Sequence, residues 1–179
     1  MIRLASLLIL VIIASSLSTS RVHAATPVEQ TVTATVTGQS VSMTVSPTSI
    51  DYGTVPFETS RTSLAAPDGA VTFEATNTGN VPEDFLVRGS AATGSGFSWA
   101  LETGAISCES PSNSNKFRHS VTPAGGLSQF LTTTNDILAA AKAPSGTQSF
   151  TSEIYMPCFG SDGAGLEATT SIVVTAVAP

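Results

Sequence analysis

The chain has 179 residues, of which 41% are hydrophobic and only 11% are charged, and its formal net charge is −6. So acidic a chain, with few cations, lacks the basic patch that binds phosphate, which argues against nucleic acid as a partner. The length suits one domain with a single core, and the many β-branched residues exclude a disordered polyelectrolyte.

Residues 1–24 have the pattern of a secretory signal peptide. Arg3 provides a short basic start, residues 4–17 are apolar apart from serines, and Val22 and Ala24 have the spacing of a cleavage site. Removal of this segment leaves five of the seven cations against all 13 acidic residues, a formal net charge of −8. We therefore expect a secreted protein, extracellular or on the cell surface. No later stretch approaches the roughly 20 apolar residues of a membrane span.

The segment after the signal, residues 25–39, carries an alternating pattern that predicts a β-strand. Val32, Ala34 and Val36 fall on one face of this strand, and threonines fall on the other. Such a strand either pairs within its own domain or inserts into a neighbouring subunit, where backbone hydrogen bonds and alternate side chains fill an open groove. Both alternatives remain open at the level of sequence.

Further strand-like stretches follow, separated by Gly, Pro and Asn turn signals. They cover residues 40–45, 60–66, 71–76, 84–88, 97–101, 116–121, 127–132, 148–156 and 167–178. Residues 135–142 (NDILAAAK) are the one helix-like segment, about two turns long. The pattern predicts an all-β fold, an immunoglobulin-like or jelly-roll-like sandwich of roughly eight to nine antiparallel strands with one short helix, spanning residues 40–179.

Two segments carry a resemblance to known domains. Residues 46–57 (SPTSIDYGTVPF), followed by residues 71–81 (VTFEATNTGNV), resemble the opening of bacterial immunoglobulin-like domains. The stretches 83–89, 97–99 and 143–150 are similar to small exported proteins of bacterial and archaeal surfaces. A more distant similarity is to the fibre-forming matrix proteins of biofilms, of the TasA and camelysin type, and to archaeal bundling pili. This resemblance implies jelly-roll-like subunits that exchange a strand.

Cys108 and Cys158 are the two cysteines of the chain. An even count in an exported protein favours one disulfide. The alternatives are two free thiols or half of a metal site, but without a nearby pair of histidines the cysteines do not complete a zinc shell.

No catalytic set is visible in the sequence, and we expect a protein that is not an enzyme. Gly-x-Ser-x-Gly, His-Glu-x-x-His and phosphate-binding loops are absent. His119, the one histidine after the signal, shares a strand face with Phe117 and Val121, which predicts a half-buried structural residue. A hydrolase would instead require His119 exposed in a cleft beside a carboxylate and a hydroxyl.

We expect no cofactor, and acidic side chains raise Ca²⁺ binding as the alternative. Glu83, Asp84 and Asp162 could hold Ca²⁺, but no Asp-x-Asp pattern is present, and solvated loop acids are the simpler interpretation. Trp99, the single tryptophan, is expected to fill the core; its alternative role is ligand contact by sugar stacking on an exposed face.

The sequence thus predicts a secreted structural subunit of a cell-surface or extracellular assembly. Its partner would be a second copy of the chain or another surface protein, with Val32, Ala34 and Val36 as the assembly strand. Head-to-tail strand donation that does not close into a ring builds a filament. The alternative is a monomeric binding module for carbohydrate or a surface protein that uses loops at one end of the sandwich.

Overall fold

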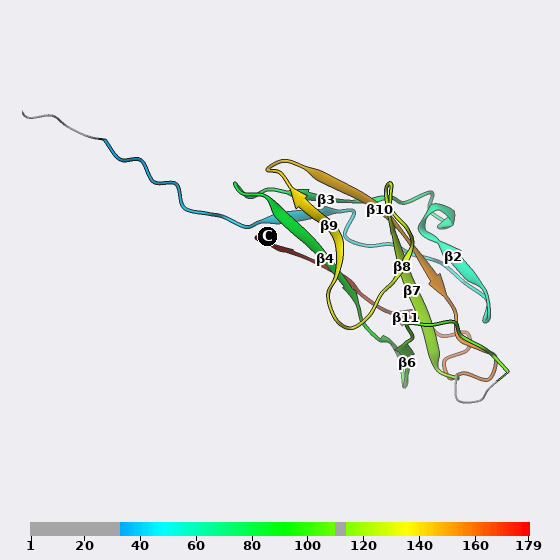
Figure 1. Cartoon of the computed structure of the whole chain (residues 1–179). Coiled ribbons are helices and arrows are strands. Elements are labelled where there is room, and N and C mark those ends of the chain that lie inside the picture. The colour runs from blue at the N-terminus through cyan, green and yellow to red at the C-terminus, as the bar shows by residue number, and fades with distance from the viewer. Residues whose placement is uncertain (1–32, 110–113) are drawn as a thin grey trace, which may run out of the picture. The chain divides into compact units, whose positions relative to one another are not determined.

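The computed structural model describes residues 33–109 and 114–179 (Figure 1). The signal segment and Val32 lie outside the described residues. Thr37–Pro179 form one compact unit, and residues 33–36 belong to a separate unit with the preceding chain. The predicted first strand is not found in the described part of that segment, because residues 33–42 form no strand and β1 begins at Met43. An alternating pattern supplies a pairing face, but a strand also needs a partner.

The unit is nearly all β, as the sequence predicts, with one 3₁₀ turn, η1, at Ser63–Ala65. Its strands are β1 (Met43–Ser46), β2 (Ser60–Thr62), β3 (Phe73–Asn77), β4 (Glu83–Gly89), β5 (Ala92–Gly94), β6 (Phe97–Leu101), β7 (Lys116–Pro123), β8 (Gln129–Phe130), β9 (Asp136–Lys142), β10 (Thr147–Tyr155), β11 (Ala168–Thr169) and β12 (Ile172–Val177). The count exceeds the expected one because two- and three-residue strands leave little alternation to read.

The strands form two sheets. The larger has the order β1-β3-β10-β7-β6-β5-β11, with β2 beside β10 and β8 beside β7, and the smaller has the order β12-β4-β9. Figure 1 shows β12, in dark red, along one side of β4, with β9, in yellow, along the other. All strand pairs are antiparallel except β6 and β7, which run parallel. The turn at residues 78–82 carries the chain from β3 in the larger sheet to β4 in the smaller.

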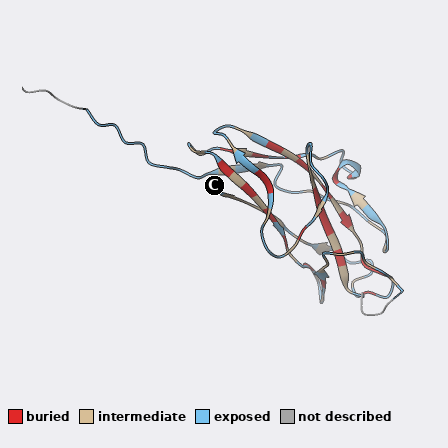
Figure 2. Cartoon of the chain, in the orientation of Figure 1, coloured by how far each residue is buried: buried red, intermediate tan, exposed pale blue. Residues whose placement is uncertain are grey.

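The inward faces of the two sheets meet in a common core. Phe73 and Phe150, paired across β3 and β10, stack with ring centroids 5.2 Å apart, and Phe85 and Val87 oppose them from β4. Figure 2 shows buried and less buried residues alternating along the strands, and the burial patterns of β4 and β10 have the period of two expected of strands with one buried face. A second cluster, around Trp99, Phe117 and Ile154, fills the end of the larger sheet nearer the disulfide.

The prediction of a helix at residues 135–142 is wrong. Asp136–Lys142 form β9, paired antiparallel with β4 through Leu86↔Ile137 and Phe85↔Ala139 with a bulge between them. Alanine-rich sequence favours a helix locally, but the free edge of β4 offers backbone partners and a place for Leu138 in the core. The predicted long last strand is likewise divided, into β11 on the larger sheet and β12 on the smaller.

Candidate docking groove

A groove of about 1220 Å³ opens into the core of the sandwich. One wall is the segment 47–57 that follows β1, and the other is the loop 163–171 that leads into β12. The floor is the inward face of the larger sheet, where the buried side chains of Phe73, Phe150 and Ile154 border the groove. The groove therefore lies beside the core, next to the end of the smaller sheet at β12.

Strand β12 borders this groove with an edge that is unpaired within the described part of the chain. It pairs with β4 on one side and stands at the end of its sheet. Ile172 and Val174 line the groove, and the five residues from Ile172 to Ala176 are all only partly buried. An apolar edge strand with free N–H and C=O groups is a template for pairing with another chain.

The wall at residues 47–57 is fixed by its own polar contacts. Gly53 has φ +63° and its N–H donates to the Asp51 carboxylate at 2.7 Å, which closes a tight turn. The guanidinium of Arg61 donates to the Tyr52 carbonyl at 2.7 Å. A Cβ at Gly53 would lie 2.9 Å from Pro67, so glycine suits the position on two counts.

The opposite wall is fixed by Trp99. Its indole N–H donates to the Asp162 carbonyl at 2.8 Å, and the ring is only 2% exposed. Gly163 has φ +83°, and a Cβ there would lie 2.5 Å from the Phe97 ring. Trp99 is thus a core residue that holds the loop, as expected, and it offers no exposed face for sugar stacking.

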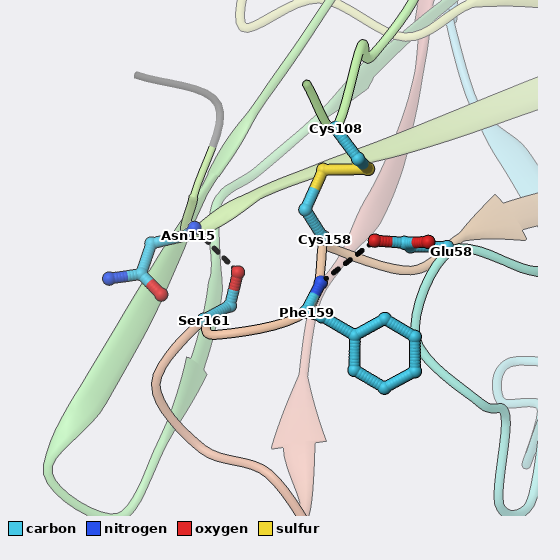
Figure 3. The surroundings of a disulfide bond; sticks show 6 residues. All are labelled: Glu58, Cys108, Asn115, Cys158, Phe159 and Ser161. Atoms are coloured by element: carbon cyan, nitrogen blue, oxygen red, sulfur yellow. Dashed lines mark hydrogen bonds between the residues drawn. A yellow bond between two sulfur atoms is a disulfide. The ribbon is translucent and has the colours of Figure 1, made fainter. Parts of the chain in front are cut away.

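The disulfide between Cys108 and Cys158 is present, with Cα atoms 5.3 Å apart (Figure 3). It joins the β6–β7 connection to the chain that follows β10. Beside it, the Glu58 carboxylate accepts a hydrogen bond from the Phe159 N–H at 3.2 Å. Glu58 and the two sulfurs lie within 4.8 Å of one another, but both sulfurs are engaged in the disulfide and are not available as thiolate ligands.

His119 is more deeply buried than expected, at 2% exposure. Nε2 lies 3.1 Å from the Tyr52 hydroxyl, which in turn lies 2.5 Å from Ser152 Oγ. Burial lowers the pKa of His119 to about 4, and burial likewise raises the pKa of Tyr52 to about 12. His119 borders the groove floor beneath Tyr52, and it is not exposed in a cleft as the hydrolase hypothesis requires.

The candidate calcium ligands are used in other ways. Glu83 is fully buried and accepts the Ser42 N–H at 2.7 Å, and the Asp84 carboxylate accepts the Ala141 N–H at 2.7 Å. The Asp162 carboxylate accepts a hydrogen bond from the Asn115 side chain. Among the described residues, none of these three acids belongs to a cluster with metal-binding geometry.

Two of the predicted assembly residues are described, and they are exposed. Ala34 and Val36 lie in the strandless segment, and Val36 is 90% exposed. The groove-lining residues were not identified from the sequence, because alternation marks Phe150, Ile154 and Val174 as core residues without telling which of them border a groove. No local signal marks Tyr52 as the partner of His119, 67 positions away.

Arg118 forms a second surface feature on the outer face of the larger sheet. Its guanidinium lies 4.6 Å from the centre of the Phe130 ring and 5.1 Å from that of Tyr155. Such stacking orients the planar cation by cation–π attraction. It forms a small mixed aromatic and basic surface.

The disulfide is typical of proteins in oxidising compartments, which fits an extracellular protein. Within the described chain, no helix has the length and hydropathy needed to cross a membrane. Compared with family profiles, curated protein sequences and solved structures, the chain has no significant match among any of the three.

Proposed function

We propose that the chain is a secreted, non-enzymatic structural subunit that assembles head-to-tail by strand donation. The residues 25–37, called the arm below, would fill the groove of a second copy and pair with the outer edge of its β12. The product would be a cell-surface or extracellular filament, of the kind found in pili and biofilm matrices. The groove beside the unpaired edge of β12 is the observation that carries this proposal.

The chemistry of arm and groove is complementary. The arm presents Val32, Ala34 and Val36 on one face, and the groove presents the partly buried Ile172 and Val174. Burial of one valine side chain contributes about 1.5–3 kcal/mol, and the new strand pair satisfies the backbone groups of β12. The alternating part of the arm, residues 31–37, would span roughly 23 Å when extended. This length matches that of the six residues of β12, about 20 Å.

The test compares two faces of the same strand in a protein that spans residues 25–179. Val36→Asp places a charge on the face that we assign to the groove, and Thr35→Asp places the same charge on the opposite face. Negative-stain microscopy and light scattering should show filaments for the unaltered protein and for Thr35→Asp, and monomers for Val36→Asp. Monodisperse monomer from the unaltered protein across salt, pH and Ca²⁺ would refute the filament proposal.

The alternative function, a monomeric binding module, is favoured by one observation. The Arg118 guanidinium, held between Phe130 and Tyr155, could bind the carboxylate of an acidic sugar while a ring stacks on the sugar face. A screen against neutral and acidic glycans tests this role, with Arg118→Gln as the variant that should lose binding. Absence of binding to any glycan would remove this alternative.

A further inference from the structure

A turn between the two sheets holds the chain immediately before β1. The side chain of Asn80 both accepts and donates a hydrogen bond to that segment. Its Oδ1 accepts the Ser40 N–H at 2.8 Å, and its Nδ2 donates to the Gly38 carbonyl at 2.8 Å. The Asn80 backbone N–H also donates to the Ser40 carbonyl at 3.0 Å. One residue therefore fixes the backbone of Gly38 and Ser40 by three hydrogen bonds.

The same turn also forms hydrogen bonds with the backbone of Ser42. Its carbonyl accepts the N–H groups of Thr78 and Gly79, at 2.8 and 3.0 Å, and its own N–H donates to the buried carboxylate of Glu83 at 2.7 Å. The hydroxyls of Thr78 and Ser42 lie 2.9 Å apart as donor and acceptor. Together, Thr78, Gly79, Asn80 and Glu83 form what we call the clamp on residues 38–42.

The clamp leaves no space for a side chain at Gly79. A Cβ at Gly79 would lie 2.3 Å from the Ser40 carbonyl oxygen and 2.4 Å from Glu83 Oε1, so no larger residue fits without displacing the segment. Asn77 stabilises the turn, because its Oδ1 accepts the Gly79 N–H while its Nδ2 donates to the carbonyls of Val81 and Lys142. Asn77 is fully buried and makes three side-chain hydrogen bonds, so its arrangement is costly to change.

The clamp and the groove lie at opposite ends of the same strands. In the β4–β12 pair, Val177 lies opposite Asp84, next to the clamp, whereas Ile172 lies opposite Gly89. The groove is lined by Ile172 and Val174, at the far end of β12 from the clamp. Strand β1 leads from the clamp end toward the groove, so the chain before Gly38 begins at the end remote from its own groove.

This placement makes insertion of the arm into its own groove unfavourable. The arm would have to reverse at Gly38, whose carbonyl is held by Asn80, and then run along β12. With Gly38 at the clamp end, residue numbers along the arm would rise in the same direction as in β12, which gives a parallel pair. A second copy is under no such constraint and can pair antiparallel, the slightly more stable arrangement.

We propose that the clamp is a positioning device that keeps the arm out of its own groove and so directs it to a second copy of the chain. This inference rests on the proposed strand donation. The Asn-Thr-Gly-Asn turn and Glu83 would then decide between a closed monomer and a growing filament, without touching the donated strand itself.

The test is energy transfer between dyes on Thr33→Cys in the arm and Leu166→Cys in the groove wall, measured within single molecules at nanomolar concentration. The clamp variant is Asn80→Ala, and the matched control is Asn135→Ala in an exposed loop. We expect low transfer in the parent and the control. In Asn80→Ala the high-transfer population should rise at least about fivefold, because two side-chain hydrogen bonds are lost.

Equal transfer in the parent and Asn80→Ala, with urea unfolding showing that both are folded, would overturn the proposal, as would high transfer in the parent. Light scattering of the unlabelled proteins at micromolar concentration separates this outcome from failure of the proposed function. A clamp-dependent change in transfer without filaments of the parent protein would refute strand donation and retain the clamp as the device that positions the arm. Filaments that form equally well with and without Asn80, at unchanged transfer, would retain donation and refute the clamp.

Discussion

The hydroxyl of Tyr52 lies 3.1 Å from Nε2 of His119, and this contact ties one wall of the groove to its floor. Tyr52 belongs to the segment that follows β1, and His119 belongs to β7. The same hydroxyl lies 2.5 Å from Ser152 Oγ on β10. This polar contact between wall and floor adds to the hydrogen bonds of Gly53 and Arg61 that hold the same wall.

Acid is expected to destabilise the domain through His119. Its pKa is about 4 in the folded protein, against 6.5 for the ordinary side chain, so the unfolded state takes up the proton first as the pH falls. This contribution to stability is complete above about pH 6.5 and is lost progressively toward pH 4, on the order of 3 kcal/mol in total. Urea unfolding at pH 7, 5.5 and 4 measures it, and in His119→Gln the loss over this range should be smaller. An equal loss in both proteins would contradict the assignment.

Removal of the Tyr52 hydroxyl should destabilise the fold by about 1–3 kcal/mol, because two buried polar groups lose their partner. Tyr52→Phe keeps the ring and removes only the oxygen that meets His119 and Ser152. Tyr155→Phe, on the outer face of the same sheet, is the matched control and should change stability little. Denaturant titration at pH 7 compares the two, and equal midpoints would show that the contact is energetically neutral.

Loss of the disulfide should lower the free energy of unfolding by about 2–5 kcal/mol. The bond closes a loop with a sequence separation of 50 residues, and it holds the chain that leads to the groove wall at residues 163–171. The double variant Cys108→Ser, Cys158→Ser removes it without leaving a lone thiol. Thermal unfolding should show the loss, and treatment of the parent protein with a reductant should reproduce it. A midpoint unchanged by both treatments would disprove a stabilising role.

A charge on the groove side of β12 should block assembly while the domain stays folded. Val174 lines the groove, whereas its neighbour Thr175 points to the opposite face of the strand. We expect Val174→Lys to abolish filaments and Thr175→Lys to permit them, because only the first places an unpaired charge where the arm would pack. Light scattering gives the readout, and circular dichroism checks that both variants are folded. Filaments from Val174→Lys would place the assembly contact elsewhere.

The sequence predicts the strands best where burial alternates cleanly. Residues 148–156 predict β10 almost to the residue, with Phe150, Ser152 and Ile154 on the inward face. Period-2 alternation depends on one face being buried, and β10 lies between β3 and β7 in the middle of the larger sheet. The disulfide was predicted equally well, because a chain with two cysteines offers each of them one internal partner.

Contacts distant in sequence account for what could not be predicted. The Ile-Leu-Ala-Ala-Ala run of β9 has helical propensity, and only the edge of β4 makes it a strand. The burial of His119 depends on Tyr52, which is 67 positions away in the sequence. The position of the groove depends on which strands pair, because the groove lies where the smaller sheet ends at β12. Local patterns carry no information about a missing neighbour.

Strand donation requires that the groove bind the arm when the arm is supplied as a separate peptide. A synthetic peptide of residues 29–38 is titrated into a protein that spans residues 37–179, the compact unit, and binding is followed by calorimetry. Strand donation predicts saturable one-to-one binding that is lost with Val32→Asp and Val36→Asp in the peptide, and also with Val174→Lys in the protein. No binding, or equal binding of the parent and aspartate peptides, would contradict it.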